Sequence, residues 1–301
     1  MLQRLRHILQ MIRFSHTVFA LPFAVLAGVM AWTLNAAADP PIAWRWRELI
    51  GILLCMIFAR SAAMAFNRIA DRRLDAENPR TAGRHLPAGV LSVKAVIFFA
   101  IICAAAFVAS TLLFLPNRLP IYLAAPVLAF LLGYSYTKRF TWLAHFWLGA
   151  ALMLAPVSAW IAIRGGAVLA DPADLLAPGV LGAAVLSWVA GFDMIYACQD
   201  VEVDVRQRLN SVPARFGVPR ALAAAAVCHA GMVALLLLLP LAYPLLGGIY
   251  TAGVVAIAGL LVYEHWLVRP DDLSRVNVAF LHVNSVVSVG LLVLTAADLY
   301  F

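Results

Sequence analysis

The sequence contains little charge for its length. Only 12% of its 301 residues are Asp, Glu, Lys or Arg, whereas 64% are hydrophobic. Because soluble globular domains carry roughly 25% charged residues, this composition excludes an ordinary soluble domain. The formal net charge is +7. We nevertheless expect no nucleic-acid partner, because the basic residues are divided among polar segments between apolar runs.

Cysteine is scarce as well. The four cysteines lie singly in or at the ends of apolar runs and form no C-x-x-C pair: Cys55, Cys103, Cys198 and Cys228. The sequence therefore favours neither a disulfide framework nor a zinc site, and we interpret these residues as small packing residues. The seven histidines, His145 among them, show no spacing typical of metal ligands. We interpret them as structural or surface residues.

Long apolar runs recur along the whole chain. A helix needs about 20 apolar residues to cross the roughly 30 Å of hydrocarbon in a bilayer. Nine segments meet this requirement: 17–38, 49–66, 93–115, 119–136, 142–163, 175–198, 221–242, 245–263 and 276–297. Since the first run is long and many others follow it, no cleavable signal peptide is needed. We expect an all-α membrane protein with nine transmembrane helices in a single domain.

The basic residues cluster in alternate loops. One set of loops contains Arg4, Arg6, Arg13, Arg68, Arg72, Arg73, Arg80, Arg84, Lys94, Lys138, Arg139, Arg206, Arg208, Arg215, Arg220, Arg269 and Arg275. The other set contains only Arg45, Arg47, Arg118 and Arg164. Positive residues favour the cytoplasmic side of a membrane. This bias predicts a cytoplasmic N-terminus and an external C-terminus, as nine spans require.

Two cytoplasmic segments carry paired acids. They read "FNRIADRRLDAENPRTAGRHLPAG" (66–89) after the second span and "DMIYACQDVEVDVRQRLNSVPARFG" (193–217) at the end of the sixth. Each contains D-x-x-x-D, as Asp71 with Asp75 and as Asp200 with Asp204. Helix positions i and i+4 share a face, so each pair directs two carboxylates to one place. Such like charges imply a cation, and an oxygen-only set that includes Asn67 suits Mg²⁺.

The surrounding bases favour a phosphate partner. Mg²⁺ held by carboxylates usually completes its coordination shell with substrate phosphate, and guanidinium groups bind phosphate oxygens in bidentate fashion. The candidate phosphate-binding residues are Arg72, Arg73, Arg80, Arg84, Lys138, Arg139 and Arg206. The alternative is that single residues of this group form solvated salt bridges at the membrane interface, which contribute little stability.

Arg60 is unusual because it lies in the middle of the second apolar run. A charged residue there costs several kcal/mol unless it has a partner, and such residues usually face a cavity. Positions 60, 64, 67, 71 and 75 are three or four residues apart, so Arg60 shares a helix face with the acidic motif. The alternative is that its side chain snorkels to a membrane interface.

At these residues the sequence resembles the UbiA superfamily of intramembrane aromatic prenyltransferases. The matching elements are R-x6-N-x3-D-x3-D (Arg60 to Asp75), "NPRTAGRHLPAG" (78–89), Y-x3-K-R-x-T (Tyr134 to Thr141) and D-x2-Y-x3-D-x3-D (Asp193 to Asp204). The resemblance implies a helical bundle around a central cavity that opens to the cytoplasm and laterally to lipid. It also implies Mg²⁺-dependent transfer of a prenyl group from a polyprenyl diphosphate to an aromatic acceptor.

The resemblance implies roles for individual residues. Mg²⁺ with the diphosphate would be bound by Asn67, Asp71, Asp75, Asp200 and Asp204. The diphosphate oxygens would be bound by Arg72, Arg84, Lys138, Arg139 and Arg206. The acceptor and the reaction centre would be lined by Arg60, Tyr134, Asp193 and Tyr196.

Within the superfamily the sequence is most similar to the 4-hydroxybenzoate polyprenyltransferase group. The segments "HTVFALPFA" (16–24) and "YACQDVEVDVRQRLNSVPARFG" (196–217) look particularly like its branch proposed to serve menaquinone synthesis by the futalosine route. In that branch the acceptor is a dihydroxynaphthoate. Asn210 stands where many ubiquinone-pathway members carry lysine, which leaves the acceptor open. The resemblance implies quinone biosynthesis in the bacterial cytoplasmic membrane.

Two other functional classes are less well supported. A transporter would also combine many spans with intramembrane charges, but the spans show no clear inverted repeat and the charges gather at one face. A scaffold would give no reason for two spaced acidic pairs.

The alternation of charge predicts that the loops holding Arg72, Lys138, Arg206 and Arg275 all face the cytoplasm. Single cysteines placed in each loop should resist an impermeant thiol reagent applied to intact cells and react after permeabilisation. Labelling of any one of the four loops from outside would contradict the nine-span topology.

Overall fold

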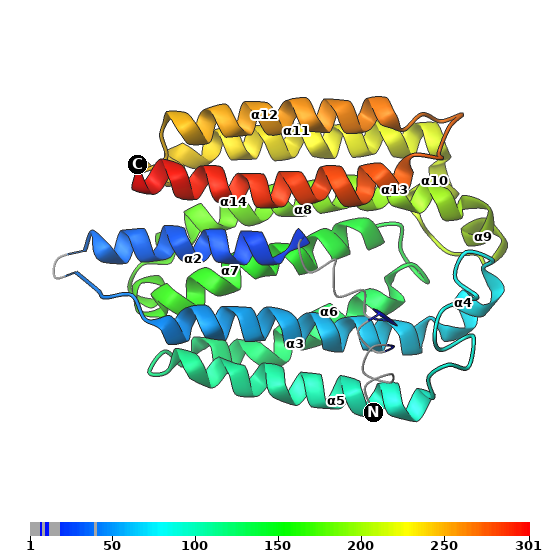
Figure 1. The fold of residues 1–301 in the computed structure, drawn as a ribbon, viewed down its shortest axis with the longest axis horizontal. Coiled ribbons are helices and arrows are strands. Elements are labelled where there is room, and N and C mark those ends of the chain that lie inside the picture. The colour runs from blue at the N-terminus through cyan, green and yellow to red at the C-terminus, as the bar shows by residue number, and fades with distance from the viewer. Residues whose placement is uncertain (1–6, 8–9, 12–18, 39–40) are drawn as a thin grey trace.

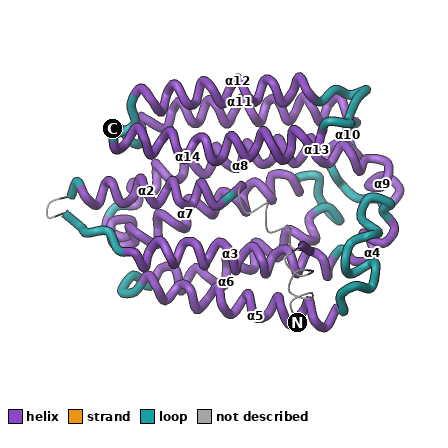
Figure 2. The backbone as a smooth tube through the Cα atoms, viewed as in Figure 1, coloured by secondary structure: helices purple, strands orange, loops and turns teal. Residues whose placement is uncertain are grey.

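The computed structural model describes residues 7, 10–11, 19–38 and 41–301, and every regular element among these residues is a helix (Figures 1 and 2). The long helices are α2 (Leu21–Ala36), α3 (Trp46–Ala70), α5 (Val93–Ser110), α6 (Leu119–Thr137), α7 (Ala144–Ala170), α8 (Leu176–Ala197), α11 (Val218–Ala242), α12 (Gly248–Leu267) and α14 (Asn284–Tyr300). The short elements are α4 (Arg72–Glu77), η2 (Thr111–Phe114), η3 (Pro172–Leu175), η4 (Cys198–Asp200), α9 (Val201–Arg206), α10 (Val212–Phe216), α13 (Val276–Val278) and η5 (Ala279–Val283).

Eight helical segments in the described part of the chain are long and apolar enough to cross a membrane. They correspond to the second through ninth predicted spans, so the all-helical membrane class is confirmed. Helix α2 overlaps the first predicted span but has only 16 residues. Positions 16–18, with Arg4, Arg6 and Arg13, lie outside the described residues. The count of nine spans and the orientation of the N-terminus therefore stay predictions.

The long helices lie side by side along one axis, and the two ends of this bundle differ (Figure 1). Helices α4, α9 and α10 gather at one end together with long loops, which Figure 2 shows in teal. The C-terminus and the connection from α2 to α3 lie at the opposite end. The two acidic segments, far apart in sequence, are thereby brought to the same end of the bundle.

Glycine allows helices α7 and α8 to approach closely. A Cβ atom at Gly149 would lie 2.4 Å from the backbone oxygen of Leu186, and one at Gly182 would lie 2.8 Å from Cγ of Met153. Small residues at such crossings let helix backbones pack tightly in membranes, where apolar burial gives little drive for association. This packing fixes α8, which carries Asp193, against α7.

Each acidic pair begins where a long helix is interrupted. Asp71 separates α3 from α4 with φ −95° and ψ 5°, and Asp200 precedes α9 with φ −106° and ψ 6°. The backbone N–H of Asp75 still donates to the oxygen of Asp71 at 2.8 Å, so the i, i+4 spacing holds across the interruption. The i, i+4 spacing predicted that the two carboxylates of each pair would be directed to one place. The break instead directs the two carboxylates of each pair toward different neighbours.

Candidate functional site

A largely apolar cavity of about 210 Å³ lies between helices α2, α3, α6 and α7. Polar lining side chains are few: Arg60, Asn67, Thr111, Tyr134 and Ser158. Along α3 the lining extends from Ile52 to Asn67, and the 15 helical steps between these two residues correspond to about 22 Å at 1.5 Å per step. Such a cavity offers room for an apolar group, with the charged Arg60 and the amide of Asn67 on the part of α3 nearer the acidic motif.

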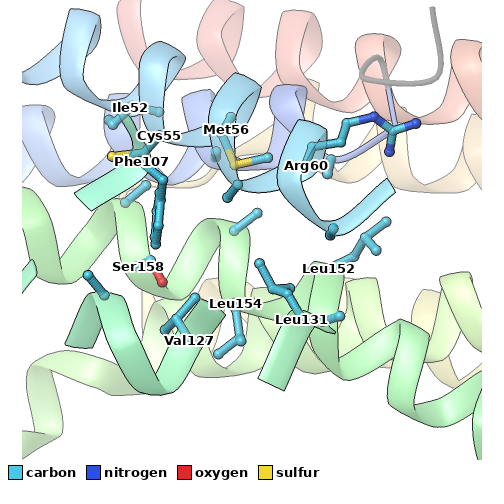
Figure 3. A pocket seen from close by; sticks show the side chains of 18 of the residues that line it. Ile52, Cys55, Met56, Arg60, Phe107, Val127, Leu131, Leu152, Leu154 and Ser158 are labelled. Atoms are coloured by element: carbon cyan, nitrogen blue, oxygen red, sulfur yellow. The ribbon is translucent and has the colours of Figure 1, made fainter. Parts of the chain in front are cut away.

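Arg60 lies on the wall of this cavity (Figure 3). It is drawn at one end of the pocket, whereas Ile52, Cys55 and Phe107 are drawn toward the other. Ten residues separate Arg60 from the end of α3 at Ala70, which places it about 15 Å along the helix from that end. This position agrees with the interpretation that Arg60 faces a cavity rather than a membrane interface.

The first acidic pair is held by basic side chains. Arg139 Nη2 donates to Asp71 Oδ1 at 3.1 Å, and Asn67 Nδ2 donates to Asp71 Oδ2 at 2.8 Å. Asp75 accepts from Arg84 Nη1 at 2.6 Å and from Arg68 Nη1 at 3.4 Å. Burial raises the pKa of the Asp71 carboxyl above its ordinary value, although the hydrogen bond from Arg139 opposes this shift.

The second acidic segment is joined to the first by Arg80. Its guanidinium binds Asp200 with two nitrogens, and Nε donates to Oδ1 at 2.8 Å. Asn78 Nδ2 donates to the same oxygen at 3.1 Å. Arg80 also donates from Nη1 to the hydroxyl oxygen of Tyr196 at 2.8 Å and lies 5.1 Å from the centre of its ring. The loop after α4 is therefore attached directly to the end of α8.

Lys138 lies among the carboxylates of the site. Its Nζ is 3.9 Å from Asp204 Oδ2. That buried oxygen has no hydrogen-bond partner among the described residues. Burial alone would lower the pKa of the Lys138 ammonium, but Asp204 and then Asp193 outweigh this effect and raise it. The backbone oxygen of Lys138 accepts from the N–H of Asn210 at 2.7 Å, which ties the loop after α6 to the segment before α10.

Asp193 has a different kind of partner. Its Oδ2 lies 2.7 Å from Nδ1 of His145, a residue of the first turn of α7 with no exposed surface. The other ring nitrogen, Nε2, accepts from the backbone N–H of Val212 at 3.2 Å. Our interpretation of His145 as a structural or surface residue did not anticipate this contact, because a single histidine without ligand spacing gives no sequence signal.

The predicted magnesium ligands are brought to one end of the bundle, but each carboxylate there is paired with a side-chain cation. Within the described residues, no group of three or more His, Cys, Asp and Glu side chains is arranged to hold a metal ion. The donor chemistry nevertheless fits Mg²⁺, because the set contains only oxygen donors and the buried Asp204 Oδ2 lacks a hydrogen bond. The ligand set therefore stays a prediction that requires the cations to move away from the carboxylates.

The predicted phosphate-binding residues divide into two groups. Four of them contact the acidic residues: Arg80, Arg84, Lys138 and Arg139. The other three are exposed at the surface: Arg72, Arg73 and Arg206. Tyr134 lines the cavity, and Tyr196 contacts Arg80 as described above. The structure adds residues that the predicted set lacked: Arg68, Asn78 and His145.

The chain is similar to one protein family and to several curated proteins that share a single name. The model of the UbiA prenyltransferase family matches residues 20–286. The 4-hydroxybenzoate octaprenyltransferase of Aliivibrio fischeri strain MJ11 is 32% identical over 273 residues, which cover 89% of each chain. The protein of the same name from Marinobacter nauticus is 34% identical over 84% of this chain and 82% of its own length.

Solved structures share the fold. The apo structure of a UbiA homologue from Aeropyrum pernix K1 has a TM-score of 0.77 at 29% identity and covers 94% of this chain and 96% of that one. A UbiA homologue from Archaeoglobus fulgidus bound to DMAPP and Mg²⁺ has a TM-score of 0.73 at 18% identity, with coverage of 97% and 98%. At that identity the second likeness concerns the fold alone.

Proposed function

The chain belongs to the UbiA prenyltransferase family, and from this premise we propose that it transfers a polyprenyl group to 4-hydroxybenzoate in quinone biosynthesis. The acceptor is suggested by curated relatives that are 32% and 34% identical and are named 4-hydroxybenzoate octaprenyltransferase. Mg²⁺ and a prenyl diphosphate are suggested by a homologue solved with Mg²⁺ and DMAPP. The site would open to the cytoplasm, in agreement with the loop charges.

The proposal depends mainly on one observation, the junction of the apolar cavity with the charged cluster. Asn67 belongs to both, because it lines the cavity and donates to Asp71. A diphosphate bound in the cluster would therefore place its prenyl chain in or beside the cavity. The allylic carbon would lie between the basic side chains and Arg60.

The residues of the chain fit distinct tasks in this reaction. Arg84, Lys138 and Arg139 would bind the diphosphate oxygens, because guanidinium and ammonium groups form strong charge-assisted hydrogen bonds with phosphate. Mg²⁺, when bound by Asn67 and the four aspartates of the two pairs, would neutralise further negative charge on the diphosphate. These interactions strengthen as charge develops on the leaving group, which is the requirement for lowering a barrier.

The bonding changes follow from the two substrates. The bond between the allylic carbon and the diphosphate oxygen breaks, and its electron pair leaves with the diphosphate. A ring carbon ortho to the phenolic oxygen forms the new bond to the allylic carbon, and the proton on that ring carbon then passes to solvent water, which restores the aromatic ring. Arg60 would pair with the acceptor carboxylate, and Asp193 and Tyr134 would lie beside the ring. Holding both reactants in this arrangement supplies much of the acceleration.

A second acceptor is favoured by one feature of the sequence. Asn210, which stands where many ubiquinone-pathway members carry lysine, binds the backbone oxygen of Lys138. The departure therefore lies next to the cluster that would bind substrate. The alternative acceptor is a dihydroxynaphthoate, which also offers a phenolic oxygen and a carboxylate.

The direct test of the function offers both acceptors in equal amounts to the purified protein with a polyprenyl diphosphate and Mg²⁺. Mass spectrometry should find prenylated 4-hydroxybenzoate as the main product. A product formed only from dihydroxynaphthoate would assign the alternative acceptor. Absence of any prenylated product from either acceptor, in folded protein, would contradict the proposed reaction.

Neutralising one aspartate in each pair should slow turnover. We expect Asp71→Asn and Asp200→Asn each to lower kcat by at least about 100-fold, corresponding to about 3 kcal/mol of transition-state stabilisation. The exposed Asp271 lies outside the site, so Asp271→Asn is the matched control and should keep normal turnover. Near-normal kcat in either folded site variant would remove that aspartate from the metal and diphosphate site.

Arg60 should control acceptor binding. We expect Arg60→Leu to raise the acceptor KM sharply and to spare the affinity for prenyl diphosphate. Arg60→Lys should restore the KM only in part, since lysine cannot form the bidentate pair. Steady-state kinetics and diphosphate binding on the same purified variants measure both effects.

The rival account is that Arg60 only stabilises the bundle by pairing with a buried acid. Arg60→Leu would then lower the melting temperature and impair both substrates alike. Arg164→Leu provides the matched control, because Arg164 forms a partly buried pair with Asp174 and does not line the cavity, so it should affect stability alone. Lost diphosphate affinity with an unchanged acceptor KM would contradict our assignment of Arg60.

A further inference from the structure

His145 connects three parts of the site that are distant in sequence. Its ring touches Asp193 of α8 through Nδ1 and the backbone N–H of Val212 through Nε2. Its own backbone belongs to the first turn of α7. No surface of His145 is exposed, and 14% of the Asp193 side chain is exposed. The contact is therefore enclosed on the histidine side and open on the aspartate side.

The two contacts fix the tautomer of the ring. A backbone N–H can only donate, so Nε2 must accept from Val212 and carries no proton. The ring proton is therefore on Nδ1, which donates it to Asp193 Oδ2 at 2.7 Å. A doubly protonated ring would direct an N–H at the Val212 N–H and lose that bond. His145 is accordingly a fixed neutral donor to Asp193.

A carboxylate with one oxygen held in this way cannot rotate freely. Asp193 lies in α8, seven residues before Asp200, which corresponds to about 10 Å along the helix axis. We propose that His145 is a positioning residue for prenyl transfer, which holds Asp193 so that its second oxygen is presented to the aromatic acceptor. This inference rests on the proposed function, because it takes Asp193 as part of the reaction centre.

The segment that fixes His145 also fixes Lys138. Asn210 donates from its backbone N–H to the Lys138 oxygen at 2.7 Å, and Val212 binds His145 two residues later. Ser211, between them, is buried and caps α10 by accepting from Ala214 N at 3.3 Å. One short segment thus sets the place of a cation of the diphosphate cluster and of the donor to Asp193. Residues 210–212 therefore fix the position of Lys138 relative to that of Asp193.

Three variants of His145 separate its two contacts. In His145→Asn the amide nitrogen can occupy the place of Nδ1 and donate to Asp193. In His145→Gln the longer side chain reaches the place of Nε2 and satisfies Val212 instead. His145→Leu removes both contacts. We expect His145→Leu and His145→Gln to lower kcat by about 10- to 100-fold, the effect typical of lost positioning partners. His145→Asn should retain more of kcat than either.

The matched control is His229→Leu. His229 is also a buried histidine, 2% exposed, but its ring bonds His265 and not Asp193. We expect it to lower the melting temperature without lowering kcat in the protein that stays folded. The affinity for prenyl diphosphate should be unchanged in His145→Gln, because this variant keeps the bond to Val212 and alters none of the diphosphate ligands.

A double-mutant cycle decides whether His145 acts through Asp193. If it does, adding His145→Leu to Asp193→Asn lowers kcat no further, because the orientation of an inactive side chain no longer matters. If the reductions in kcat caused by the two single substitutions multiply in the double variant, the proposal is overturned. A His145→Gln variant with the kcat of the wild-type protein would overturn it as well. If His145→Leu does not fold, the kcat values of His145→Asn and His145→Gln decide instead. A higher kcat in His145→Asn supports the proposal, and an equal or lower one overturns it. Failure of the proposed function is distinct, because wild-type protein would then form no product or Asp193→Asn would be fully active.

Discussion

The pairing of carboxylates with basic side chains at one end of the bundle is the constraint on which the rest of the structure depends. Charges at the edge of an apolar interior are costly unless they are paired, and here each aspartate of the two motifs has a cationic neighbour. These partners come from two separate loops, the one after α4 and the one after α6. Pairing therefore draws together the ends of α3, α6 and α8. The cavity adjoins these ends at Asn67, which lines the cavity and donates to Asp71.

The same ion pairs would have to open for a metal ion and a diphosphate to enter. Mg²⁺ would take the carboxylates, and the released cations would take the phosphate oxygens.

Much of this organisation could be predicted from the sequence, because apolar length and i, i+4 spacing are local properties. The predicted second through ninth spans coincide with α3 to α14, and Arg60 lies on the cavity wall as its helix face indicated. The interruptions at Asp71 and Asp200 were not predicted, because the motif spacing is the same with or without them. The partner of each carboxylate also could not be predicted. Arg80 lies 120 residues from Asp200, and no local pattern links them.

His145 shows the limit of motif reasoning most clearly. Its sequence context is an apolar run with no second ligand nearby, so a packing role was the better expectation. Its contacts arise from tertiary structure, since Gly149 lets α7 approach α8 one turn further along the helix. A polar residue that is isolated in sequence can thus belong to a site once helix packing is known.

The central claim is that the carboxylates now paired with cations exchange them for a metal ion when the diphosphate binds. Crystals grown with Mn²⁺ in place of Mg²⁺ and an uncleavable prenyl thiolodiphosphate would test it through the anomalous signal of the metal. The account predicts metal density between the Asp71–Asp75 and Asp200–Asp204 segments, with Arg84, Lys138 and Arg139 turned to the phosphate oxygens. Metal bound elsewhere, or a diphosphate bound while the carboxylate pairs stay closed, would contradict it.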